Sequence, residues 1–419
     1  MRSATATSLV ALALAACTPP AASDEADTSE ATDAGTESDT GGEPHPCDPA
    51  IELPTSSPAA IAWQPIGELT IDDAGHSGWI EIPIAAGQRY LAVRSVNLNG
   101  EPTTHELLCH DLLEARLSDG TELIPAANAE LLPTHQRSYQ GPGAGVFVFS
   151  SALEPLAGPD VVELRVQFRD CALRVGATRL RFPDMPTQIR VDAASEPIPS
   201  PEASARVAVR MLISEDSGWA PTTEDPALAQ AWAVAVQRFA AIGVQLELEA
   251  EGRVGPVGQL DYEGEMLPMR SLHDEVLACL RRDADDARFV PVVLVPCIHL
   301  TDQIQMTASF PLGQATRIPG ALDDATSPSV VVVAAGACDE DGEPAPSQSP
   351  ERHGVVLAHE IGHYLGLHHS DAPLGEHAAG EASEQLMSSG IATSVEVDQA
   401  WFSAGQAQIL RRHPDLVFE

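Results

Sequence analysis

Three histidines lie at a fixed spacing within residues 354–370, the segment GVVLAHEIGHYLGLHHS. His359 and His363 are four residues apart, so on a helix their imidazoles project from one face and can bind the same cation. Gly366 permits a left-handed turn that ends the helix, after which His369 can return as a third nitrogen ligand. Three protein ligands leave one tetrahedral position for water, which is typical of a catalytic metal site.

Glu360 follows the first of these histidines and can reach a water at the site without occupying the metal. A structural zinc site would use four protein ligands and would not need this carboxylate. We therefore expect Glu360 to act as a general base, taking the proton of the attacking water and passing it to a leaving amine. His368 is a rival third ligand, but the spacing favours His369, and His353 needs no role.

The pattern H-E-x-x-H-x-x-G-x-x-H, matched in full at residues 359–369, resembles that of the metzincin metallopeptidases. The resemblance implies one catalytic Zn²⁺, a metalloendopeptidase acting on extracellular proteins, and a downstream Met-turn, a role that Met387 fits. AHEIGHYLGL resembles the matrixins and YLGL is also similar to the pappalysins, so the subfamily stays open, as do any Ca²⁺ sites. Residues 313–320 are a candidate strand for pairing with the substrate backbone.

The rest of the chain predicts two folded regions. Residues 47–195 contain short alternating runs rich in β-branched and aromatic residues, which favour an all-β, sandwich-like domain. Residues 196–204 form a Pro-rich linker, and residues 205–419 alternate strands with helices, which predicts an α/β domain. With the metzincin resemblance, this becomes a twisted mixed sheet with an active-site helix. The β-rich domain could bind substrate, bind a surface partner, shield the site as a pro-region, or act as a spacer.

Individual elements follow from local patterns. Asp225 before Pro226 predicts a capped helix start, and Gly243 predicts its end. We expect strands at 80–84, 90–93, 146–149, 161–168, 206–213, 244–250, 290–295 and 330–335, and a second helix at 272–282.

The N-terminus carries an export signal. Residues 1–16 contain a short apolar run that suits a signal peptide, and LAAC, ending at Cys17, resembles the lipobox of bacterial lipoproteins. The resemblance implies cleavage before Cys17 and acylation of its thiol, whereas the alternative is ordinary secretory cleavage. Residues 17–46 are acidic and poor in hydrophobic side chains, which predicts a disordered tether. We expect an exported protein, lipid-anchored at the cell envelope or secreted.

The formal net charge of −38 limits the partners. Such a chain repels nucleic acid and anionic membrane surfaces, so we expect no nucleic-acid partner and membrane contact only through the lipid. The metzincin resemblance implies polypeptide substrates, and we expect a monomer. Setting Cys17 aside leaves six cysteines in an oxidising compartment, which favours disulfides. The expected pairs are Cys109 with Cys171, and one pair within Cys279, Cys297 and Cys338.

Two other functions remain open. One is a surface-anchored binding lipoprotein whose β-rich region carries the function and whose zinc domain is vestigial. The other is a metal-dependent hydrolase acting on bonds other than peptide bonds. The intact Glu360 argues against the first, because a peptidase that had lost its activity need not keep its base.

Overall fold

The structure of the chain is a computed structural model. It describes residues 61–99, 108–124, 136–141, 144–150, 160–170, 186–200, 203–257, 260–263, 288–302, 307–309, 311–315, 320, 329–338, 348–369, 386–388, 391 and 395–419. By its internal contacts the chain divides into Met1–Glu43 and Pro44–Glu419, and all described residues belong to the second unit. The predicted signal peptide, the tether and the helix at 272–282 lie outside the described residues. Within the described part, no helix is long and apolar enough to cross a membrane.

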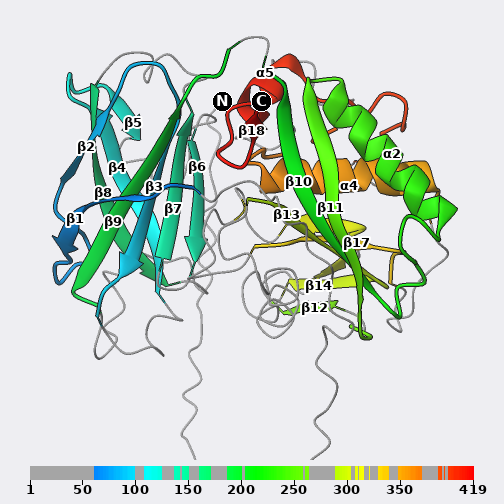
Figure 1. Ribbon diagram of the computed structural model, residues 1–419. Coiled ribbons are helices and arrows are strands. Elements are labelled where there is room, and N and C mark those ends of the chain that lie inside the picture. Colours follow the sequence, from blue (N-terminus) through cyan, green and yellow to red (C-terminus); the bar gives the residue numbers. More distant parts are fainter. Residues whose placement is uncertain are drawn as a thin grey trace, which may run out of the picture. The chain divides into compact units, whose positions relative to one another are not determined.

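The first half of the described chain forms two antiparallel sheets (Figure 1). The five-stranded sheet has the order β1-β9-β3-β7-β6 and contains β1 (Gln64–Thr70), β3 (Gln88–Asn97), β6 (Gln136–Gly141), β7 (Ala144–Ser150) and β9 (Gln188–Pro197). The four-stranded sheet has the order β2-β8-β4-β5 and contains β2 (Ile80–Ile84), β4 (Leu108–Leu117), β5 (Glu122–Ile124) and β8 (Asp160–Asp170).

One hydrophobic cluster takes side chains from both of these sheets. It includes Ile82 and Phe168 from the four-stranded sheet and Val93 and Phe147 from the five-stranded sheet. Along β2 the buried and exposed residues alternate, because successive side chains of a strand point to opposite faces. The apolar residues that predicted these strands therefore form their common core.

The second half is built on a mixed sheet with the order β11-β10-β13-β17-β16. Its strands are β10 (Ala205–Ser214), β11 (Val244–Val254), β13 (Val290–Val295), β16 (Gly313–Ala315), β17 (Val331–Ala334) and β18 (Val417–Phe418), which pairs with β10. β10, β11, β13 and β17 are parallel, whereas β16 runs antiparallel to β17 at the edge. A separate small sheet contains β12 (Leu260–Glu263), β14 (Ile298–Asp302) and β15 (Thr307–Ser309).

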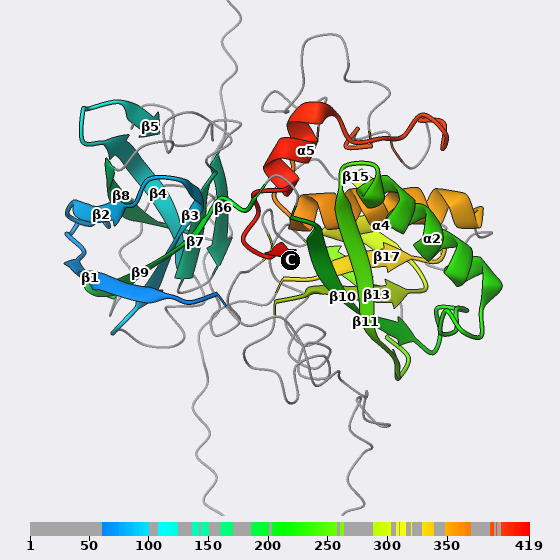
Figure 2. The same cartoon turned by 45° about the horizontal axis from the view of Figure 1, so that its top comes forward.

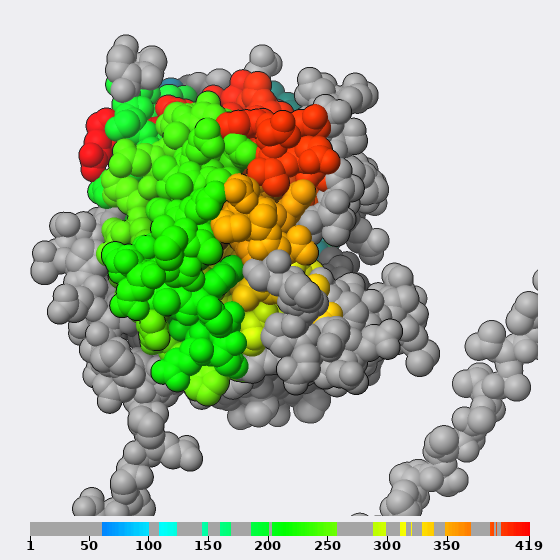
Figure 3. Space-filling view, turned by 90° about the vertical axis from the view of Figure 1, so that its right-hand side faces the viewer, coloured from blue at the N-terminus to red at the C-terminus, as the bar shows by residue number. Residues whose placement is uncertain are grey.

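Among the described residues, three helices accompany this sheet: α2 (Pro226–Ala240), α4 (Pro350–Tyr364) and α5 (Ala404–Leu410). The Asp225 side chain accepts the first free amides of α2, which confirms the predicted cap. α2 and α4 lie side by side against the sheet (Figures 2 and 3). Their approach is close because α4 has Gly354 at the contact, where a Cβ would lie 2.3 Å from the Ala231 carbonyl oxygen. The chain is therefore a mixed α/β protein dominated by strands.

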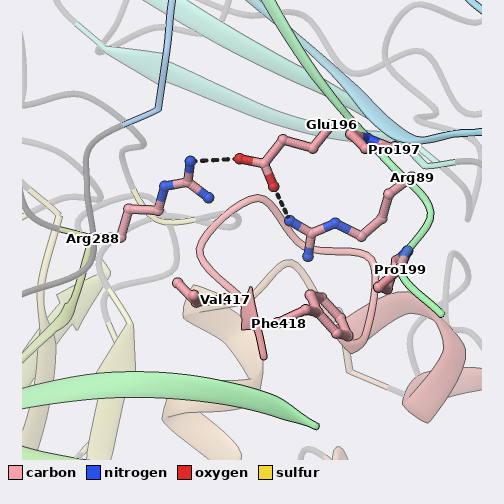
Figure 4. Close-up of a pocket in the computed structure, with 7 residues that line it drawn as sticks. All are labelled: Arg89, Glu196, Pro197, Pro199, Arg288, Val417 and Phe418. Carbon is pink, nitrogen blue, oxygen red and sulfur yellow. Dashed lines mark hydrogen bonds and ion pairs between the residues drawn. The ribbon is translucent and has the colours of Figure 1, made fainter. Parts of the chain in front are cut away.

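Two arginines hold the last residues of the chain, and Figure 4 shows that both point toward Glu196. Arg89 of β3 donates to the carbonyl oxygens of His413 at 2.9 Å and Leu416 at 3.0 Å. Its guanidinium also lies 2.6 Å from the Glu196 carboxylate of β9. Arg288, just before β13, pairs with the same carboxylate and donates to a main-chain carbonyl of the C-terminal segment at 3.0 Å. These charged side chains line a cavity together with Pro197, Pro199, Val417 and Phe418.

Candidate metal centre

Helix α4 positions two of the three predicted ligands. The Ser349 hydroxyl caps its start by accepting from the Arg352 amide, and Pro350 occupies the first turn, where no amide donor is needed. From residue 353 to residue 364 every residue of the helix is buried. His359 and His363 lie one turn apart in this buried stretch, and their ring centroids are 4.5 Å from each other.

A turn after α4 brings in the third histidine. The helix ends at Tyr364, and Gly366 has a φ of 97°, a left-handed conformation in which a side chain would be strained. The Leu367 amide then donates back to the Gly362 carbonyl at 3.0 Å, which closes the turn. His369 follows, with its ring centroid 4.6 Å from that of His363 and 5.2 Å from that of His359.

The three histidines form a group that could hold a metal ion. One ring nitrogen from each lies within 4.8 Å of the other two. The Nδ1 of His359 donates to the Leu386 carbonyl at 2.6 Å, and the Nδ1 of His363 donates to the Leu367 carbonyl at 2.7 Å. A carbonyl can only accept, so each Nδ1 carries the proton and each Nε2 presents a lone pair.

The spacing of two ring nitrogens in this group fits a small tetrahedral cation. The Nε2 atoms of His359 and His369 are 3.3 Å apart. Two nitrogens bound tetrahedrally to one zinc at about 2.0–2.1 Å stand about 3.3 Å from each other. Burial, the first cause, and the neighbouring imidazoles hold the pKa of His363 well below 6.5, so this ring is neutral, as a ligand must be.

Met387 lies beside this group. Its side chain is fully buried and belongs to the same hydrophobic cluster as Ile361 of α4 and Leu365, the residue that follows the helix. At Gly362, a Cβ would stand 2.7 Å from the Met387 sulfur, so the absence of a side chain there lets the methionine pack against α4. Because Leu386 also accepts from His359, this short segment both supports the helix and orients one imidazole.

Glu360 faces the edge strand β16. The residue is 5% exposed, and burial raises the pKa of its carboxyl group to about 8, although a hydrogen bond from the Ala315 amide lowers it. A divalent cation nearby would favour the ionised form, as any close opposite charge does. Gly313, two residues before Ala315, also lies close to Glu360. A Cβ at position 313 would stand only 2.6 Å from the Glu360 Cγ, so the strand has no room for a side chain there.

Several other predicted residues can be placed. His368 is partly exposed next to His369. His353, for which the sequence predicts no role, is buried, donates from Nε2 to the Ala335 carbonyl at 3.0 Å and packs edge-on against Trp219. Nothing in the sequence pattern signals these two contacts, because both partners are distant along the chain.

The cysteines agree in part with the prediction. Cys297 and Cys338 form a disulfide, which confirms one pair within the predicted set of three. Cys109 is also disulfide-bonded. Its predicted partner, Cys171, lies outside the described residues, as do Cys17 and Cys279, so that pairing and the lipidation site stay predictions.

Comparison with known proteins adds little. No protein-family model matches the chain, and no curated protein matches it. Among solved structures, the chain is similar to metalloproteinase-II from Bacteroides fragilis, with 17% sequence identity and a TM-score of 0.30. The similarity covers 54% of this chain and 62% of that chain, so it spans less than two thirds of the other protein. A likeness this slight says nothing about the activity of this chain.

Proposed function

We propose that this protein is a zinc-dependent endopeptidase with a metzincin-like catalytic domain. The observation that carries the proposal is the set of three imidazoles whose ring nitrogens lie within 4.8 Å of one another, with Glu360 next to the first of them. Three nitrogen ligands with a neighbouring carboxylate suit a hydrolytic metal site better than a structural one. Imidazole ligands in a tetrahedral arrangement favour zinc among the common divalent ions.

The ion and the side chains would contribute different parts of the reaction. A bound zinc supplies a Lewis acid and lowers the pKa of water at the site. Glu360 accepts the proton of the attacking water and delivers it to the amine that leaves. The Ala315 amide holds the Glu360 carboxylate in place by a hydrogen bond. The carbonyls of Leu386 and Leu367 fix the rings of His359 and His363.

The edge of the mixed sheet offers a place for an extended peptide. β16 (Gly313–Ala315) is the last strand in the order of that sheet, and it contacts α4 next to Glu360. An edge strand has backbone groups that can pair with an added strand, and a substrate bound in this way presents successive peptide bonds to the site. We infer that substrates bind as extended chains along β16, which suits cleavage within polypeptides.

We further propose the domain organisation and the location of the enzyme. A β-sandwich domain over 47–195 and a linker over 196–204 would precede the peptidase domain at 205–419. A lipid on Cys17 and the acidic tether at 17–46 would hold the folded part outside the cell. The short apolar run before Cys17 and the cysteine content support export.

Removal of the metal tests the function. The purified protein should contain about one zinc per chain and cleave an unfolded protein such as casein. A chelator should abolish cleavage, and added zinc should restore it, because the three imidazoles remain in place to bind the ion. A protein that cleaves casein equally well after complete removal of metal is not a metallopeptidase. One that binds zinc yet cleaves no polypeptide favours the binding-lipoprotein alternative.

A further inference from the structure

The edge strand β16 begins with a glycine that its backbone does not require. Gly313 pairs in regular register with Val333 of β17, and its φ does not lie in the positive range that favours glycine. A residue with a side chain could adopt the same backbone. Glycine within a strand normally weakens it, so the position needs another explanation, and a close approach by a neighbouring group is the usual one.

The neighbouring group is the proposed catalytic base. A Cβ at position 313 would lie 2.6 Å from the Glu360 Cγ and 2.9 Å from its Oε1, both closer than real Cβ contacts. It would also lie 2.8 Å from Cγ1 of Val356, one turn earlier on α4. Gly313 and Ala315 are alternate residues of one strand and share a face. The strand that lacks room for a side chain at position 313 thus also supplies, at Ala315, an amide that bonds to the Glu360 carboxylate.

A second glycine brings the chain back to the same helix. The Gly320 amide donates to the Tyr364 carbonyl at 2.6 Å, at the end of α4. A Cβ at position 320 would lie 2.3 Å from the Tyr364 ring. Gly313 thus approaches α4 at Val356, one turn before Glu360, and Gly320 approaches it at Tyr364, one turn after. The short distance between the segment around β16 and α4 depends on these two glycines.

We propose that Gly313 is a positioning residue for the base of the proposed peptidase, and this inference rests on that proposed function. The missing side chain lets β16 come near enough to α4 for the Ala315 amide to hold the Glu360 carboxylate towards the three histidines. A methyl group at position 313 must displace either the Glu360 side chain or the strand. In both cases the carboxylate loses its place, while His359, His363 and His369 keep theirs.

Gly313→Ala tests this directly. Misplacement of a reacting group by about 1 Å can cost about 10²-fold in rate. We expect kcat on a peptide substrate to fall by about that factor, with KM changed less than about threefold and with zinc content unchanged. Gly255→Ala is the matched control, because Gly255 also lacks a positive φ and no heavy atom lies within 4 Å of an added Cβ. It should keep the turnover and the zinc content of the wild type.

The contact between position 313 and Val356 allows a second variant to test the inference. Val356→Ala makes room for the methyl group on that side and leaves the contact with Glu360 in place. The double variant should therefore remain about 10²-fold slower than Val356→Ala alone, with zinc bound. It also carries the test if Gly313→Ala alone fails to fold.

Three results would overturn the inference while leaving the proposed function intact. They are a Gly313→Ala enzyme within about threefold of the wild-type kcat, a double variant as fast as Val356→Ala, and loss of zinc from Gly313→Ala. The second result would mean that Gly313→Ala slows the enzyme through its contact with Val356 of α4. The third would mean that the substitution disturbs the three histidines themselves. A wild-type protein that binds zinc and cleaves nothing would instead refute the proposed function and this inference with it.

Discussion

The contact between Arg89 and the C-terminal segment should contribute strongly to stability. The Arg89 side chain is 2% exposed, and it joins Glu196 of β9 to the carbonyl oxygens of His413 and Leu416. Arg89→Met keeps the apolar stem and removes the guanidinium. The Leu416 carbonyl then loses its arginine donor, whereas the His413 carbonyl keeps the Leu416 amide at 3.1 Å. Each buried group left without a partner costs about 1–3 kcal/mol, although Glu196 keeps Arg288 and is partly exposed to solvent.

The expected loss is therefore about 1–3 kcal/mol in the free energy of unfolding. Urea unfolding followed by tryptophan fluorescence measures it. Arg116→Met is a matched control, because Arg116 also pairs with a glutamate, Glu163, at 2.5 Å, but the two side chains are 44% and 24% exposed. An exposed pair of this kind contributes about 0–1 kcal/mol. If Arg89→Met costs no more than Arg116→Met, the buried contact does not stabilise the C-terminal segment as reasoned here.

Two further predictions concern stability. Replacing Cys297 and Cys338 by serine should lower the free energy of unfolding by about 4 kcal/mol, because their disulfide closes a loop with a sequence separation of 41 residues. A loss below about 1 kcal/mol in urea unfolding would contradict this. For Glu196, burial alone would raise the pKa, but Arg288 and Arg89 lower it below 4.5. Its ionised form therefore adds stability above pH 4.5, which is lost as the pH falls through the lowered pKa. The stability difference between wild type and Glu196→Gln should narrow below that pH, and a constant difference would refute the assignment.

Local sequence signals predicted the elements that build the site. The pattern His-Glu-x-x-His defined a helical face, and α4 places both imidazoles within its buried stretch. Asp225 before Pro226 located the start of α2, and the apolar run at 290–295 became a strand buried along its whole length. Each of these features depends on neighbours within a few residues, where periodicity and capping carry the information.

Contacts between distant residues could not be predicted in this way. The carbonyl of Leu386 orients His359 from 27 residues away. Gly313 stands against Glu360 because β16 pairs with β17 at the sheet edge beside α4, and no local pattern sets that pairing. The shared contact of Arg89 and Arg288 with Glu196 likewise joins segments that are far apart in sequence. Tertiary packing decides these neighbours, so a single sequence read for local periodicity leaves them open.

The most direct test of the proposed function compares metal content with turnover in two variants. Glu360→Gln keeps the size of the side chain and all three imidazoles, so it should hold about one zinc per chain and lose about 10²- to 10⁴-fold in kcat. His369→Ala leaves two ligands on the helix and should lose most of the zinc together with the activity. A Glu360→Gln protein that binds zinc and turns over peptide at nearly the wild-type rate would contradict the mechanism proposed for this site.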